Sequence, residues 1–272
     1  MMVGVARGAI LAEGSIRFDD GDAYERGMSP WSRRAGETCL DWLAPPLGLR
    51  WLDVGCGTGA FTELIVQRCA PVETQGIDPQ EAQLAVARAR PSVRGVAFLR
   101  GDAMALPFER DRFDAAVMAL VIFFVPDPAS GVAEMARVVR PGGLVAAYGW
   151  DLLGGGFPFE PIWEQSRAAG VTPLLPPSPS AGGIDALRAL WIGAGLEAVE
   201  TREIVVERTF ASFEEYWATS TITGGVRPLL DAMTTDERDE LKARVRTQLP
   251  SDAMGRVTRR ARANAVKGRV PR

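Results

Sequence analysis

The sequence predicts an α/β fold: a doubly wound, mostly parallel sheet of seven strands with helices on both faces. Between residues 50 and 148, short apolar segments alternate with amphipathic helical segments, a pattern typical of parallel strands joined by right-handed crossovers. The apolar strand at 50–54 also runs directly into a glycine-rich turn, the usual strand–helix junction at a ligand site. A last strand at 257–270 is expected to return antiparallel.

Each element is expected from its apolar periodicity and its flanking turn residues. An approach helix carries apolar residues at near-helical spacing from Trp31 to Leu43 and stops before Pro45-Pro46. Loops rich in glycine, proline and serine surround the helices that follow Trp150. The expected strands are 50–54, 72–77, 96–100, 113–118, 143–148, 196–210 and 257–270. The expected helices are 58–69, 80–90, 128–139, 158–169, 185–194, 212–220 and 235–248.

Composition excludes several classes of protein. The 272 residues are 47% hydrophobic and 24% charged, which is ordinary for a globular chain. A formal net charge of -3 gives no electrostatic reason to expect nucleic acid as a partner. No apolar run is long enough to predict a membrane span, and the first 12 residues are too short and mixed for a signal peptide. Three scattered cysteines predict a reducing, cytoplasmic location; nothing in the sequence indicates an oligomeric state.

The chain contains no histidine. This removes the commonest general base and the commonest metal ligand, so no metal site is expected. The last segment is locally basic, without an acid after Asp252. Two interpretations remain open for it: a solvated edge strand and tail, or a contact with RNA or an anionic substrate. Its basic residues are Arg256, Arg259, Arg260, Arg262, Lys267, Arg269 and Arg272.

Three successive strand ends carry residues suited to a cofactor. The first strand ends in Asp53 and leads to glycines at 55, 57 and 59, which allow a ligand to approach the backbone. The next strand ends in Asp78, and a carboxylate there can accept two hydrogen bonds from a ribose diol. The third leads to Asp102. The glycine spacing differs from the dinucleotide fingerprint, because Ala60 stands where the third glycine of that fingerprint is expected.

These motifs resemble those of class I (Rossmann-like) S-adenosylmethionine-dependent methyltransferases, in particular the type found in ubiquinone and menaquinone biosynthesis. The resemblance covers residues 24 to 150 approximately, and each motif falls at its own strand end. The matching segments are Leu52 to Gly59, Asp78, Asp102-Ala103, Ala105 to Phe108, Phe113 to Val117, and Val138 to Gly143.

The resemblance implies S-adenosylmethionine as the cofactor. In that assignment the glycine-loop backbone binds the methionine and ribose portion, and Asp53 faces the ammonium group. Asp78 takes the ribose hydroxyls, and Asp102 takes the adenine amine. The implied cofactor-binding set is Asp53, Gly55, Cys56, Gly57, Thr58, Gly59, Asp78, Pro79, Asp102, Ala103, Ala119 and Leu120. The apolar segment from Ala119 to Val125 lines this pocket or packs in the core; the sequence leaves both open.

The same resemblance divides the chain by function. Residues 1–47 are expected to form a helical lid segment and 48–150 the cofactor-binding core. Insertions at 151–183 and 211–252 are expected to form a substrate cap, while 184–210 and 253–272 complete the core.

The expected reaction is in-line methyl transfer to a small, partly apolar or aromatic molecule, because aromatic residues are frequent in the cap segments. A histidine-free enzyme suits this reaction, since the sulfonium already activates the methyl group and the protein mainly aligns the reactants. No catalytic side chain is identified. Two alternatives remain: a non-catalytic S-adenosylmethionine-binding regulator or scaffold, and an NAD-dependent oxidoreductase. The residues expected to orient a substrate are Tyr24, Trp31, Tyr148, Asp151, Tyr216 and Arg262.

Overall fold

The computed structural model describes residues 26–223 and 225–272 and contains a seven-stranded sheet in the order β3-β2-β1-β4-β5-β7-β6. Strands β1 to β5 pair in parallel, and β7 runs antiparallel to β5. The predicted doubly wound sheet with an antiparallel last strand is therefore confirmed. The strands are β1 (Arg50–Val54), β2 (Glu73–Asp78), β3 (Ala97–Arg100), β4 (Phe113–Ala119), β5 (Val139–Trp150), β6 (Glu197–Phe210) and β7 (Val257–Arg269).

The central strands are apolar because both of their faces are covered. In β1, Trp51, Leu52 and Val54 are fully buried, and β4 is buried from Ala115 to Met118. Continuous apolar runs of this kind are typical of parallel sheets with helices on both sides. Asp53 interrupts the run as a fully buried acid, and it therefore needs a separate explanation.

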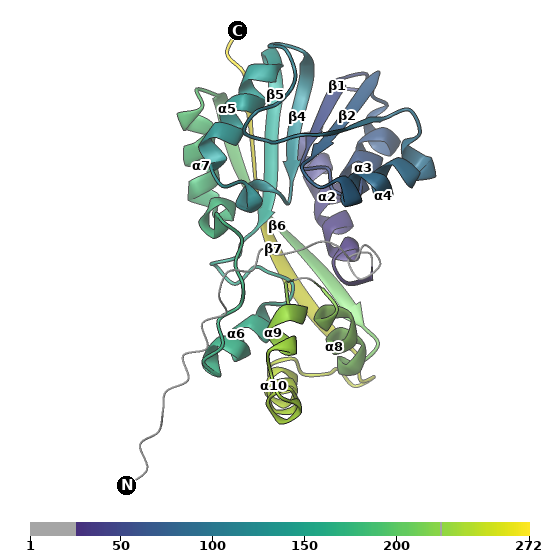
Figure 1. Ribbon diagram of the computed structural model, residues 1–272, viewed down its shortest axis with the longest axis vertical. Coiled ribbons are helices and arrows are strands. Elements are labelled where there is room, and N and C mark those ends of the chain that lie inside the picture. Colours follow the sequence, from purple (N-terminus) through teal and green to yellow (C-terminus); the bar gives the residue numbers. More distant parts are fainter. Residues whose placement is uncertain (1–25, 224) are drawn as a thin grey trace. The chain divides into compact units, whose positions relative to one another are not determined.

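Helices flank these strands in two groups (Figure 1): α2, α3 and α4 lie beside β1 and β2, whereas α5 and α7 lie beside β4 and β5. Helix α5 starts at Pro128 after Asp127, whose side chain accepts hydrogen bonds from the amides of Ala129 and Ser130. The helices of this part are α2 (Ser29–Leu43), α3 (Ala60–Cys69), α4 (Glu81–Ala89), α5 (Pro128–Val138) and α7 (Ile184–Gly193).

The chain divides into two compact units. The larger one comprises 29–158, 177–207 and 260–272 and contains β1 to β5 with the helices above. The smaller one comprises 159–176, 208–259 and the described residues before Ser29. It contains α6 (Glu160–Ala168), α8 (Phe213–Thr221), α9 (Arg227–Asp231) and α10 (Thr235–Gln248). Helix α6 packs on α10, and the indole of Trp163 donates to the carbonyl of Gly225 at 3.0 Å.

Most element boundaries agree with the predicted ones to within two residues. Strand β1 and helix α10 match at both ends, and α10 begins with a capping box between Thr234 and Glu237. Helix α3 starts at Ala60 rather than 58, because Gly59 adopts a left-handed conformation at its N-cap. Strand β5 starts at Val139, earlier than predicted, with an irregular register opposite Phe113–Ala115. The five-residue helix α9 was not predicted.

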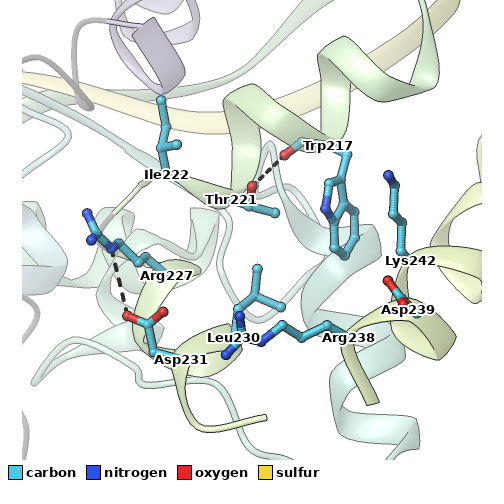
Figure 2. A pocket seen from close by; sticks show the side chains of 9 residues that line it. All are labelled: Trp217, Thr221, Ile222, Arg227, Leu230, Asp231, Arg238, Asp239 and Lys242. Carbon is cyan, nitrogen blue, oxygen red and sulfur yellow. Dashed lines mark hydrogen bonds and ion pairs between the residues drawn. The ribbon is translucent and has the colours of Figure 1, made fainter. Parts of the chain in front are cut away.

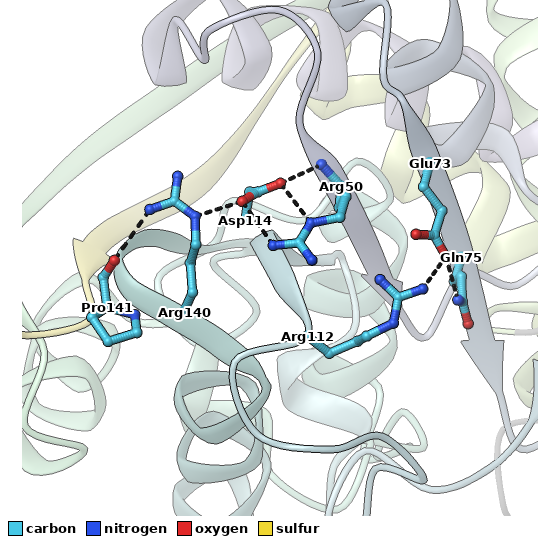
Figure 3. Close-up of polar contacts among 7 residues, drawn as sticks. All are labelled: Arg50, Glu73, Gln75, Arg112, Asp114, Arg140 and Pro141. Atoms are coloured by element: carbon cyan, nitrogen blue, oxygen red, sulfur yellow. Dashed lines mark hydrogen bonds and ion pairs between the residues drawn. The ribbon is translucent and has the colours of Figure 1, made fainter.

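The amino-terminal edge of the sheet is closed by ion pairs (Figure 3). Asp114, at the start of β4, accepts from the backbone N–H of Arg50 at 2.8 Å, from the Arg50 guanidinium, and from Nε of Arg140 at 2.5 Å. Hydrogen bonds from Arg50, joined by those from Arg140, hold the pKa of Asp114 well below its usual range. Glu73 likewise accepts hydrogen bonds from the side chains of Arg112 and Gln75.

No helix within the described part of the chain is both long and apolar enough to cross a membrane.

Candidate functional site

A tight loop from Gly55 to Gly59 connects β1 to α3 at the carboxyl ends of the parallel strands. The amides of Gly55 and Cys56 both donate to the carbonyl of Ile77, at 2.7 and 3.0 Å, which ties the loop to β2. The amide of Gly57 donates to Oδ2 of Asp78 at 3.0 Å. The loop then delivers the chain into the first turn of α3, whose leading amides have no acceptor within the helix. Such a helix start attracts an anionic group.

The three glycines of the loop all have positive φ, but they differ in what lies next to them. A Cβ at Gly55 would lie 2.5 Å from the side chain of Val121, so this glycine permits close packing of the segment after β4. A Cβ at Gly59 would lie 3.2 Å from Ala87, so this one permits close packing of α4. A Cβ at Gly57 would meet only Oε1 of Gln83, at 3.7 Å. Gly57 is thus the glycine that faces open space.

Asp53 is fully buried beneath the loop. Its Oδ2 accepts a 2.6 Å hydrogen bond from the hydroxyl of Thr62 in α3, whereas its buried Oδ1 has no partner among the described residues. Burial raises the pKa of Asp53 to about 7; the hydrogen bond from Thr62 opposes this shift, and the charge of Asp78 adds to it. A buried acceptor without a donor is costly, and it indicates a polar group that the site is built to receive.

Asp78 ends β2 and is buried. Its two oxygens accept one backbone N–H each, from Gly57 at 3.0 Å and from Gln80 at 2.8 Å. Burial raises the pKa of this carboxyl above its usual value, and the two backbone hydrogen bonds oppose that shift. Each carboxylate oxygen can accept a further hydrogen bond, so Asp78 can still bind a pair of hydroxyls. Pro79, which follows it, is exposed.

The next two strand ends complete this edge. Asp102 is exposed, and its Oδ1 accepts from the amide of Met104 at 2.9 Å; Ala103 beside it is half-buried. At the end of β4, Ala119 and Leu120 are half-buried. Leu120 has a φ of +64°, and its amide donates to the carbonyl of Tyr148 at 2.8 Å. A left-handed leucine costs roughly 1–2 kcal/mol, and such strain is concentrated at functional sites.

Three residues that shape this edge, Thr62, Gln83 and Arg90, were not predicted, and Val121 was predicted only as part of the apolar segment from Ala119 to Val125. Thr62 orients Asp53, Val121 packs on Gly55, and Gln83 stands opposite Gly57. Arg90, at the end of α4, donates through Nε to the carbonyl of Thr58 at 2.6 Å. Only Thr62 lies on the segment that follows the glycine motif; the others reach the loop from distant parts of the sequence.

The described residues among those predicted to orient a substrate belong to both compact units. Trp31 and Tyr148 are buried in the larger unit and Tyr216 in the smaller one. Asp151 and Arg262 pair with each other at 2.6 Å, which ties the segment after β5 to β7. Tyr24 and the start of the predicted lid lie outside the described residues. A substrate-binding role for these side chains stays a prediction.

The smaller unit holds a cavity of about 370 Å³ among α8, α9 and α10 (Figure 2). The indole of Trp217 forms one wall, with Leu230 beside it. Charged groups surround it: Lys242 pairs with Glu214 at 2.7 Å, and Arg227 with Asp231 at 3.7 Å. The lining residues are Trp217, Thr221, Ile222, Arg227, Leu230, Asp231, Arg238, Asp239 and Lys242.

The basic segment near the carboxyl terminus is largely neutralised by acids. Arg260 pairs with Glu207 and Lys267 with Glu200, both on β6. Lys267 also lies 4.6 Å from the ring of Trp42. The expectation of an edge strand is wrong, because β7 lies between β5 and β6 in the sheet. A contact of this segment with RNA or an anionic substrate stays a prediction.

Comparison with known proteins finds similarity in the core. Residues 52–147 match the family described as "Methyltransferase domain". A chloroplastic 2-methyl-6-phytyl-1,4-hydroquinone methyltransferase 2 of Oryza sativa is 43% identical over 101 residues, which are 37% of this chain and 29% of the relative. A demethylmenaquinone methyltransferase of Staphylococcus aureus is 37% identical over 123 residues, which are 44% of this chain and 49% of the relative. The chain thus spans less than half the length of either relative.

A solved structure extends the similarity in fold. Phosphoethanolamine N-methyltransferase 2 of Haemonchus contortus, in complex with S-adenosyl-L-methionine, superposes with a TM-score of 0.59 at 18% identity. The match covers 96% of this chain and 61% of that one. At this identity the likeness concerns the fold.

Proposed function

We propose that this protein transfers a methyl group from S-adenosylmethionine to a small molecule, because residues 52–147 match the family described as "Methyltransferase domain" and the sheet has the doubly wound order expected for the Rossmann-like class. The observation that carries the proposal is the carboxyl edge of β1 and β2. There a glycine loop, a buried acid with an unpartnered oxygen and a second acid converge on one place.

The residues present fit this methyl donor. Oδ1 of Asp53, buried without a donor, suits the ammonium of the methionine portion, directly or through a water molecule. Asp78 retains acceptor capacity for the two ribose hydroxyls. The amides that lead into α3 and the open side of Gly57 suit the methionine carboxylate and the backbone contacts near it. The exposed Asp102 can accept from the adenine amine, with Ala103, Ala119 and Leu120 as pocket walls.

When bound, S-adenosylmethionine supplies an electrophilic methyl group on a sulfonium. Transfer breaks the carbon–sulfur bond, leaves its electron pair on sulfur, and forms a bond from the methyl carbon to the acceptor. The contribution of this chain is to align the two reactants and to exclude water. Any proton released by the acceptor passes to water or to a side chain other than histidine, because the chain has no histidine.

For the acceptor, we propose a small aromatic molecule of the hydroquinone type as the first candidate. The names of the two curated relatives support this choice, since both concern quinone-type rings. An electron-rich ring is already nucleophilic, which agrees with a site without an evident strong base. We also propose a cytoplasmic location, on the three free cysteines, all of them buried.

We further propose that the predicted cap segments, 151–183 and 211–252, recognise the acceptor, and that the cavity of the smaller unit contributes to this. Its volume of about 370 Å³ falls within the range of small-molecule sites, and its wall combines an indole with charged groups. A Trp217→Ala variant should raise KM for the acceptor and leave the Kd of S-adenosylmethionine unchanged. Trp217→Phe, which keeps an aromatic wall, is the matched control.

Two measurements test the function. Thermal unfolding with S-adenosylmethionine, S-adenosylhomocysteine or NAD should show a raised midpoint for the first two only, because a ligand of the folded state stabilises it. A raised midpoint with NAD alone would favour the oxidoreductase alternative.

Incubation with methyl-labelled S-adenosylmethionine and a panel of short-chain hydroquinones, with phosphoethanolamine as a contrasting acceptor, should label a ring compound. Binding without any labelled product from the panel or a metabolite extract would favour the scaffold alternative.

A further inference from the structure

The peptide between Thr58 and Gly59 makes no hydrogen bond to the sheet among the described residues; its N–H donates to the carbonyl of Cys56 at 2.8 Å, within the loop itself. The amides of Gly55 and Cys56 bond to β2, and that of Gly57 bonds to Asp78. The carbonyl of Thr58 instead accepts from Nε of Arg90 at 2.6 Å. A second nitrogen of the same guanidinium, Nη2, lies 3.4 Å from the Thr58 hydroxyl.

Arg90 also holds the start of the next helix. Its Nη1 pairs with Glu63 at 3.2 Å, in the first turn of α3. The side chains of Arg90 and Glu63 are 21% and 17% exposed, so this pair is well shielded from solvent. One guanidinium therefore contacts both the loop and the helix whose amides are expected to face the cofactor. Arginine suits this arrangement because its donors form a rigid planar fork.

The backbone of Arg90 is itself fixed. Its amide donates to the carbonyl of Ala87 at 3.1 Å, and the following Pro91 restricts it to an extended conformation. Helix α4 starts at Glu81, shortly after Asp78, and ends at Ala89, with Arg90 as its C-cap residue. The segment from 78 to 90 thus holds the loop at two points: Asp78 accepts from Gly57, and Arg90 donates to Thr58.

We infer that Arg90 is a positioning residue that keeps the glycine loop in its cofactor-binding conformation; this rests on the proposed function. The physical reason is the flexibility of the loop. Gly57 and Gly59 have φ values of +51° and +80° and flank Thr58, so two permissive residues surround the peptide that Arg90 holds. Fixing that peptide before binding lowers the entropic cost of ordering it when the ligand arrives.

Arg88 provides a matched control. It lies two residues earlier, in α4, donates to the carbonyl of Phe98 at 2.9 Å and pairs with Glu81; neither of these partners belongs to the glycine loop. Arg90→Gln should weaken binding of S-adenosylhomocysteine about tenfold in calorimetry, whereas Arg88→Gln should change it by less than about twofold. With an acceptor, Arg90→Gln should raise KM for S-adenosylmethionine more than it lowers kcat.

Two further variants separate positioning from charge and from folding. Arg90→Lys keeps the charge but not the fork, and should recover only part of the affinity. Glu63→Gln weakens one contact of Arg90 and should reduce the affinity for S-adenosylhomocysteine roughly two- to threefold. This variant replaces Arg90→Gln in the test if Arg90→Gln does not fold. Equal affinities for Arg90→Gln and Arg88→Gln, or full recovery with lysine, would overturn the inference. A wild-type protein that binds neither ligand would instead overturn the proposed function.

Discussion

The pKa values of the acids are shifted in opposite directions at the two edges of the parallel sheet. At the amino edge, Asp114 lies between two arginines, and hydrogen bonds from Arg50 and Arg140 lower its pKa (Figure 3). At the carboxyl edge, Asp53 and Asp78 receive hydrogen bonds from a hydroxyl and from backbone amides but make no ion pair, and burial raises the pKa of both.

This difference separates the acids that stabilise the fold from those available to a ligand. Asp114 has its acceptor capacity occupied, so its contribution should appear in stability. Asp53 keeps one buried oxygen without a partner, and Asp78 keeps spare acceptor capacity, so their contribution should appear in binding. Natural proteins often give up stability at such sites, because a preorganised site leaves polar groups to be satisfied by the ligand.

The largest expected effect is a pH dependence of opposite sign at the two edges. The pKa of Asp53 is about 7 in the folded protein and about 3.9 when unfolded. Its contribution to stability is therefore complete below pH about 4 and is lost as the pH rises to about 7, with an upper bound of about 4 kcal/mol. The lowered pKa of Asp114 has the opposite consequence: its contribution is present above pH about 4 and is lost on acidification.

Denaturant unfolding of the ligand-free protein at a series of pH values measures both slopes. Subtracting the Asp53→Asn curve from the wild-type curve should give a difference that falls between pH about 4 and 7, and the Asp114→Asn difference should rise from low pH. Parallel wild-type and Asp53→Asn curves would mean that Asp53 titrates near its ordinary pKa.

The next effect concerns how close packing of the glycine loop stabilises the carboxyl edge. A Gly55→Ala change places a Cβ 2.5 Å from Val121 at a φ of +74°, so we expect a loss of about 3 kcal/mol in the free energy of unfolding. Gly57→Ala meets only the flexible end of Gln83 and should cost about 1 kcal/mol, while obstructing the ligand side of the loop. Equal losses of stability in the two variants would contradict the separate roles of these glycines.

The carboxyl edge also shows what the sequence can predict. Gly55, Asp78 and Asp102 follow apolar strands, and parallel strands end at one edge, so their common location follows from local pattern and topology. Arg90 could not be found in this way, and for the segment containing Val121 the sequence left pocket lining and core packing open, because each residue reaches the loop through a contact between segments far apart in the chain. Helix α9 of the smaller unit could not be predicted either, because a helix of only five residues shows little periodicity.

The predicted start of β5 was wrong because the local sequence favours a turn where the structure has a strand. Pro141-Gly142-Gly143 is typical of a turn, so β5 was expected to start at 143. The strand nevertheless starts at Val139, since Val139 pairs with Phe113 and the ladder resumes at Leu144 beyond a bulge. Tertiary pairing therefore overrode the local preference for a turn.

At the amino edge, Asp114→Ala should cost about 2 kcal/mol in the free energy of unfolding at pH 7. The variant leaves Arg50 and Arg140 without their acceptor, and it removes the acceptor of a backbone amide. The two arginines are 36% and 47% exposed, so water compensates part of the loss. Chemical denaturation measures this cost. Calorimetry should find the affinity for S-adenosylmethionine unchanged, and a weakened affinity would show that the two edges are not independent.

The complementary change at the carboxyl edge is Asp78→Ala. It removes the acceptor proposed for two ribose hydroxyls and the acceptor of the Gly57 amide, so affinity for S-adenosylmethionine should fall more than tenfold, beyond about 1.4 kcal/mol. The free energy of unfolding should change by less than about 1 kcal/mol, because losing two backbone hydrogen bonds is offset by removing a buried carboxylate whose pKa is raised. An affinity equal to that of the wild type, in the same calorimetric titration as Asp114→Ala, would remove Asp78 from the cofactor site. It would also leave Gly57, Asp53 and the start of α3 to hold the ligand.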